Sequence, residues 1–160
     1  MFNPHFKILF MKAFRISTPL VFLGLVLIFS GCGSKGTPAE STQDKQLGLL
    51  SQTWKVATVT LDTKDQTTTW ANFQLTISGT KGNTTFNYSC AGRPTLGPWP
   101  ASGTWTFGTD PVTQIIRTED NLNMTYTVTA TTLQVNFNYA GNGYSRVSNV
   151  SGNWIFNFTK

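Results

Sequence analysis

Apolar and polar residues alternate at every second position along much of the chain after residue 50. Strands with one buried face produce this period of two, whereas amphipathic helices produce a period of 3.6. The alternation is strictest over residues 122–128 and 133–139. The pattern predicts an all-β fold whose strands lie at 53–61, 73–77, 86–90, 103–108, 113–118, 122–128, 133–139 and 154–158. One short helix is expected at 47–51.

The links between the predicted strands alternate in length. Those after the second, fourth and sixth strands are short, whereas those at 62–70, 91–102 and 140–152 are long. In an up-and-down antiparallel arrangement the long links all fall at one end. We therefore predict an eight-stranded up-and-down antiparallel barrel with the short N-terminal helix at its closed end. The interior of such a barrel is either packed or wide enough for one small ligand.

The first part of the chain has the pattern of a targeting sequence. Lys12 and Arg15 precede an apolar run at 19–29, which is too short to span a bilayer comfortably, and Ser30 and Gly31 then precede Cys32. This ending resembles the lipobox of bacterial lipoproteins, so residues 1–31 are expected to be removed and Cys32 to be acylated. Met11 could be the true start, and N-terminal mapping of the precursor would test that hypothesis.

The remaining chain is interpreted as a tether followed by one domain. Residues 32–46 comprise the acylated cysteine and a polar, flexible segment, and residues 47–160 form the barrel. Gly33 follows the cysteine, and without an aspartate there we expect the outer membrane of the cell envelope. Loss of Lys7, Lys12 and Arg15 leaves nine basic against seven acidic residues, a charge of +2. That charge argues against nucleic acid as a partner.

Three segments resemble the lipocalin-like domains of small, mostly uncharacterised Gram-negative lipoproteins. They are LGLL at 47–50 ahead of WKV at 54–56, PWPASGTWTF at 98–107, and VSGNWIFNFTK at 150–160. Lipocalins carry a G-x-W motif on the first strand, whereas here it falls at 103–105 in the fourth. The resemblance covers roughly residues 47–160. It implies a barrel fold and a location in the cell envelope, but it does not imply an enzymatic reaction.

The residue types needed for catalysis are scarce. The single histidine, His5, lies in the segment that we expect to be removed, so no His-assisted nucleophile or His-ligated metal site is expected. Cys90 is interpreted as a small, buried apolar residue without a disulfide partner. The domain's carboxylates all fall in predicted turns, where such groups commonly cap the backbone: Asp62, Asp65, Asp110, Glu119 and Asp120. We expect no catalytic residue, metal or cofactor.

The long-loop end gathers aromatic and cationic side chains next to glycine and proline. Candidate ligand-binding residues there are Trp70, Arg93, Trp99, Tyr144 and Arg146. The simpler interpretation is that Trp70 and Trp99 cap the core and that the two arginines are solvated. The other three tryptophans, Trp54, Trp105 and Trp154, alternate with polar neighbours and are predicted to lie in the core.

Three functions therefore stay open at this stage. One is a membrane-anchored, lipocalin-like binder of a small apolar or amphipathic ligand at the open end of the barrel. Another is a non-enzymatic envelope module that presents its loops to a protein or glycan partner. An enzyme is the least favoured of the three. In each case we expect a monomer held to the membrane by the lipid on Cys32.

Overall fold

The structure is a computed structural model, and it describes residues 39–140 and 150–160. Residues 39–160 form one compact unit. The predicted signal peptide at 1–31, the lipidation site Cys32 and the candidate residues Tyr144 and Arg146 lie outside the described residues. The elements run in the order α2 (Thr42–Leu50), β1 (Thr53–Leu61), β2 (Lys64–Asp65), β3 (Gln74–Ser78), β4 (Phe86–Ala91), β5 (Ser102–Phe107), β6 (Gln114–Arg117), β7 (Leu122–Val128), β8 (Thr132–Tyr139) and β9 (Gly152–Thr159).

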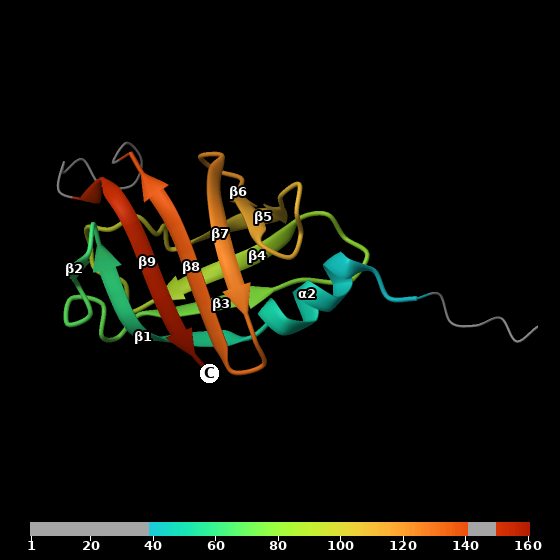
Figure 1. Cartoon of the computed structure of the whole chain (residues 1–160), viewed down its shortest axis with the longest axis horizontal. Helices are drawn as coiled ribbons and strands as arrows, with labels where there is room; N and C mark the ends of the chain where they lie inside the picture. The colour runs from blue at the N-terminus through green and yellow to red at the C-terminus, as the bar shows by residue number, and fades with distance from the viewer. Residues whose placement is uncertain (1–38, 141–149) are drawn as a thin grey trace, which may run out of the picture. The chain divides into compact units, whose positions relative to one another are not determined.

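The strands form a closed antiparallel barrel (Figure 1). From β3 to β9 each strand pairs with the next in the sequence, β1 pairs with β3, and β1 also pairs with β9 along its length. This last pairing closes the sheet and confirms the predicted eight-stranded up-and-down barrel. The two-residue β2 was not predicted, and it pairs with the end of β1 as a small hairpin inside the first long link.

A bulge in β1 explains why the alternation of this strand is weaker than that of its neighbours. The pairing register with β9 shifts between Val56 and Thr58, so that Ala57 is an extra residue. Trp54 before the bulge and Val59 after it both point into the core although their spacing is odd. A bulge of this kind bends the strand and increases its twist, which helps β1 to pair with both β3 and β9.

The helix is longer than the sequence pattern indicated. It begins at Thr42 rather than Leu47, so residues 42–46, which we assigned to the tether from their polar composition, belong to α2. Ser41 is the N-cap, and its hydroxyl accepts a 3.0 Å hydrogen bond from the backbone N–H of Asp44. Because the added turn carries no apolar residue, hydrophobic periodicity could not reveal it.

The helix lies at the end of the barrel that carries the short links, as predicted. Asp44 accepts a 2.8 Å hydrogen bond from the backbone N–H of Gly82 in the β3–β4 link, and the Tyr126 hydroxyl donates to Gln46 at 3.2 Å. Leu47 and Leu50 are buried in the core. The helix therefore caps the closed end of the barrel with an apolar face.

Aromatic rings fill the side of the interior next to β1 and β9. Phe156 is fully buried at the centre of this cluster, and its ring lies within 6.0 Å, centroid to centroid, of six others. Those neighbours are Trp70, Phe73, Trp99, Phe137, Trp154 and Phe158. Trp54, Trp105 and Trp154 are all buried, which confirms their predicted place in the core.

Candidate functional site

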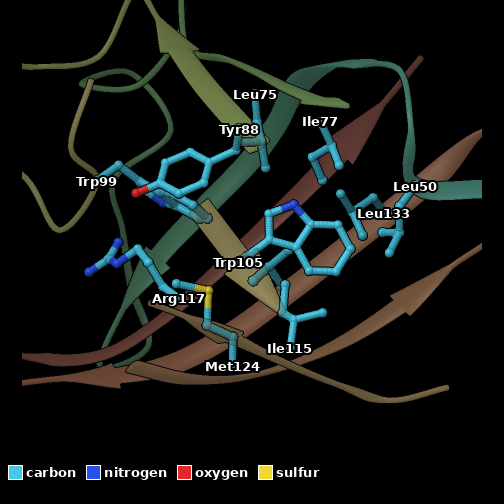
Figure 2. A pocket seen from close by; sticks show the side chains of 11 residues that line it. Leu50, Leu75, Ile77, Tyr88, Trp99, Trp105, Ile115, Arg117, Met124 and Leu133 are labelled. Carbon is cyan, nitrogen blue, oxygen red and sulfur yellow. The ribbon is translucent and has the colours of Figure 1, made fainter. Parts of the chain in front are cut away.

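A small cavity lies inside the barrel next to the Phe156 cluster, and Trp99 belongs to both. Six strands from β3 to β8, the last residue of α2 and the β4–β5 link contribute to its wall (Figure 2). The lining residues are Leu50, Leu75, Ile77, Tyr88, Trp99, Trp105, Ile115, Arg117, Met124, Leu133 and Val135. The volume open to the centre of a water-sized sphere is about 20 Å³. That is room for about one water molecule in this conformation.

Two tryptophans in the cavity wall bring buried hydrogen-bond donors to it. The side chains of Trp99 and Trp105 are each 3 % exposed. Within the described part of the chain, neither indole Nε1 atom has a hydrogen-bond partner. Trp54 and Trp154 differ, because their Nε1 atoms donate to the carbonyl oxygens of Leu50 and Val150 at 3.0 and 2.7 Å. Unpartnered buried donors are rare in folded proteins, so this pair requires an explanation.

A buried arginine lies at the long-loop end of the same cavity. Arg117 is 1 % exposed, and Asp120 binds it with both carboxylate oxygens, to Nε at 2.9 Å and to Nη2 at 2.6 Å. Its Nη1 donates to the carbonyl oxygen of Pro98 at 2.7 Å, and the guanidinium carbon lies 5.7 Å from the ring centroid of Trp99. The carboxylate neutralises the buried charge, and the carbonyl satisfies a further donor.

Sequence reasoning missed this arginine. Arg117 follows Ile115 at a spacing of two on β6, so both side chains face inward, and Asp120 lies in the adjoining link to β7. The sequence did contain a signal for this buried ion pair: an inward-facing arginine followed three positions later by an acidic residue. Asp120 was expected only to cap the backbone of its turn. It does receive a weak 3.4 Å bond from Leu122 N–H, but its main partner is Arg117.

The candidate residues chosen from the sequence do not form one surface site. Trp70 and Trp99 are buried and touch Phe73 and Phe156, which agrees with the simpler interpretation that they cap the core. Of the two, only Trp99 lines the cavity. Arg93 is half-buried and donates to the carbonyl oxygen of Trp99 through a long 3.5 Å bond. The structure therefore moves the candidate site from the loop surface to the interior.

The turn carboxylates other than Asp120 hold the backbone. Asp62 accepts a 2.8 Å bond from the N–H of Asn153, and Glu119 accepts one from the N–H of Thr104. Side-chain and backbone hydrogen bonds from Thr67 lower the pKa of Asp65, and a bond from the Thr113 hydroxyl followed by one from Val112 N–H lowers that of Asp110. Asp65 and Asp110 thus cap their own turns, as expected, whereas Asp62 and Glu119 accept hydrogen bonds from the backbone of segments distant in the sequence.

Other chemistry is limited in the described residues. Burial raises the pKa of the Cys90 thiol to about 12, so the thiol is protonated at neutral pH and is a poor nucleophile. Residues 39–140 and 150–160 contain no group of three or more His, Cys, Asp and Glu side chains that could hold a metal ion. No helix in these two ranges is long and apolar enough to cross a membrane.

Comparison with known proteins adds no family. No protein-family model matches the chain, and searches of the curated proteins and of the solved structures found no match either.

Proposed function

We propose that this protein is a membrane-anchored, lipocalin-like lipoprotein whose barrel binds a small apolar or amphipathic ligand. The observation that carries the proposal is the apolar cavity inside the closed barrel, whose wall includes Trp99, Trp105 and Arg117. Ligand sites are typically concave and mostly apolar, with a few placed polar groups. The role is one of binding rather than catalysis, since the carboxylates described above hold turns or pair with Arg117.

The size of the cavity limits the ligand. Room for about one water molecule admits a larger guest only if side chains in the wall move. Met124 is the wall residue best suited to this, because its unbranched thioether side chain changes rotamer readily. The neighbouring cluster around Phe156 consists of interlocked rings and is expected to stay in place. We therefore expect a compact ligand whose entry requires side chains around Met124 to rearrange.

A cavity-filling variant tests ligand binding directly. Val135→Ile adds a methyl group to the cavity wall, whereas Val128→Ile adds the same group to a partly buried site elsewhere on the core. Native mass spectrometry of residues 33–160, purified gently from a bacterial host, is expected to show a non-covalent adduct for the parent and for Val128→Ile. The adduct should decrease or vanish for Val135→Ile. A clean apo mass for all three, repeated after incubation with lipid and envelope extracts, would contradict the proposal.

The anchor forms a separate part of the proposal. The basic start, the apolar run at 19–29 and the small residues before Cys32 support acylation of that cysteine and an outer-membrane address. Expressed in a Gram-negative host, the full chain is expected to carry acyl chains on Cys32 by intact-mass analysis and to fractionate with the outer membrane. Cys32→Ser should abolish both properties. Recovery of the unmodified parent protein in the soluble fraction would be inconsistent with an anchor.

A second candidate is a non-enzymatic envelope module that presents its loops to a protein or glycan. The tight filling of the barrel around Phe156 favours it, because a packed barrel needs no guest for stability. The mass measurement separates the two candidates. An adduct-free protein would direct the search to partners of the long loops.

A further inference from the structure

The unpartnered indole groups carry information about the chemistry of the ligand. Trp99 and Trp105 line the cavity, both are almost fully buried, and each contributes a donor that no described residue satisfies. A buried donor without a partner is destabilising, because it has lost its bond to water. The barrel satisfies the same group on Trp54 and Trp154 with backbone carbonyls. Among the tryptophans that the structure describes, the two whose buried Nε1 atoms lack a partner are therefore the two in the cavity wall.

The placement of these rings leaves an acceptor to be supplied from inside the cavity. Figure 2 shows the ring of Trp105 lying across the middle of the lining residues, with its nitrogen on the edge that faces Leu75 and Ile77. The nitrogen of Trp99 lies beside Tyr88 at the end of the cavity where Arg117 is found. An indole N–H is a donor only. The matching group on a guest is consequently an acceptor oxygen.

The charge of the site indicates that this acceptor is neutral. Arg117 is the charged residue in the cavity wall, and Asp120 already binds it with both carboxylate oxygens. An anionic guest would enter a site whose positive charge is already compensated and would lose its own hydration, which is unfavourable. The remaining wall offers hydrocarbon surface from residues such as Leu75, Ile77 and Met124.

We infer that the ligand is a small, neutral, carbonyl-bearing molecule with a compact hydrocarbon body, whose oxygen accepts a hydrogen bond from Nε1 of Trp105, of Trp99 or of both. This inference rests on the proposed ligand-binding function and names the class of ligand. The hydrocarbon body packs against the aliphatic and thioether side chains of the wall, such as those of Leu75, Ile77 and Met124.

Two probes of nearly the same shape test the inference. Cyclopentanone carries a carbonyl oxygen, and methylenecyclopentane replaces that oxygen with a CH₂ group. Each is titrated into ¹⁵N-labelled protein spanning residues 33–160, which retains the whole compact unit. Indole N–H signals are followed by NMR and assigned with Trp→Phe variants. Cyclopentanone should bind about tenfold more tightly than methylenecyclopentane, because only the ketone satisfies a buried donor.

The indole signals supply an internal control. The ketone should shift the N–H signal of Trp105, Trp99 or both in the direction of a new hydrogen bond, whereas the signals of Trp54 and Trp154 should stay in place. Trp105→Phe and Trp99→Phe together should abolish the preference for the ketone, and Trp54→Phe should preserve it. The comparison of probes on the parent protein is decisive even if a variant fails to fold.

The failures are distinguishable. If neither probe binds, both the inference and the proposed function are overturned. If the two probes bind equally, the inference falls and the proposed function stands. The same holds if the indole N–H protons of Trp99 and Trp105 still show contact with a bound water molecule while the ketone is present. Cyclopentanecarboxylate binding as tightly as the ketone would overturn the requirement for a neutral ligand.

Discussion

At the residue scale, the central feature is a charged side chain where alternation predicts an apolar one. Arg117 shares the inward face of β6 with Ile115, and its guanidinium is held by Asp120, by the carbonyl of Pro98 and by the ring of Trp99. Sequence reasoning placed Asp120 in a turn but could not connect it with Arg117. The connection depends on which face of β6 points inward, and on the β4–β5 link folding back over it.

Removing the Asp120 carboxylate alone should lower the free energy of unfolding more than replacing Arg117 and Asp120 together. In Asp120→Ala the buried guanidinium loses its counter-charge, and we expect the free energy of unfolding to fall by about 2 kcal/mol. This loss is smaller than that expected for a fully buried ion pair, because the Asp120 side chain is 25 % exposed. Arg117→Met with Asp120→Ala should recover most of that loss, since the methionine needs no counter-charge. Urea unfolding followed by circular dichroism measures both. Equal destabilisation of the single and double variants would disprove this account.

At the element scale, α2 and β1 show where local patterns are insufficient. The first turn of α2 depends on Ser41 and Asp44 rather than on apolar periodicity, and β1 contains a bulge that changes its inward face halfway along. A Ser with an Asp three positions later is a recognisable start signal for a helix. The helix start was therefore readable from the sequence, although the polar composition of 33–46 obscured it. The bulge depends on the pairing of β1 with β9.

The cap of α2 gives a prediction with a pH dependence. Ser41→Ala should lower the free energy of unfolding by about 1 kcal/mol at pH 7, because the N-cap hydrogen bond is lost. Hydrogen bonds from Ser41 and then from Gly82 N–H lower the pKa of Asp44 below its ordinary value of 3.8. That stabilisation is present above about pH 3.8 and is lost as the pH falls through the lowered folded-state value.

Chemical denaturation at pH 7 and at successive values below pH 4 tests both parts of this prediction. Ser41→Ala should show a shallower loss of stability on acidification than the parent, and Ser51→Ala, at the other end of the helix, serves as the control. Identical acid profiles for parent and Ser41→Ala would show that the Ser41–Asp44 contact does not act as described.

At the scale of the whole molecule, the interior is divided between a filled side and a side with a cavity. Phe156 and its neighbouring rings fill the space beside β1 and β9, where the sheet closes. The cavity lies next to this cluster, and its wall includes Met124 and the two unpartnered indoles. Under the function that we propose, one part of the core maintains the barrel and the other part admits a ligand.

The two sides should respond differently to substitution. Phe156→Ala removes the centre of the ring cluster, and we expect a loss of about 4 kcal/mol in the free energy of unfolding or failure to fold. Met124→Leu preserves apolar volume at the cavity wall and should lower the free energy of unfolding by less than about 1.5 kcal/mol. Guanidinium unfolding of both variants provides the comparison. A similar cost for the two substitutions would refute the proposed division of the core.

The sequence by itself determined the strand-rich architecture, the number of main barrel strands and the alternation of short and long links. It did so because a strand with one buried face imposes a period of two, as in the uninterrupted alternation of β8 from Leu133 to Tyr139. It also placed Trp54, Trp105 and Trp154 in the core. Only the tertiary structure decided that Trp99 turns inward to meet Arg117, and that the indoles of Trp99 and Trp105 lack acceptors beside a cavity. Those properties arise from contacts between distant strands and links, and no local pattern encodes which buried donor finds a partner.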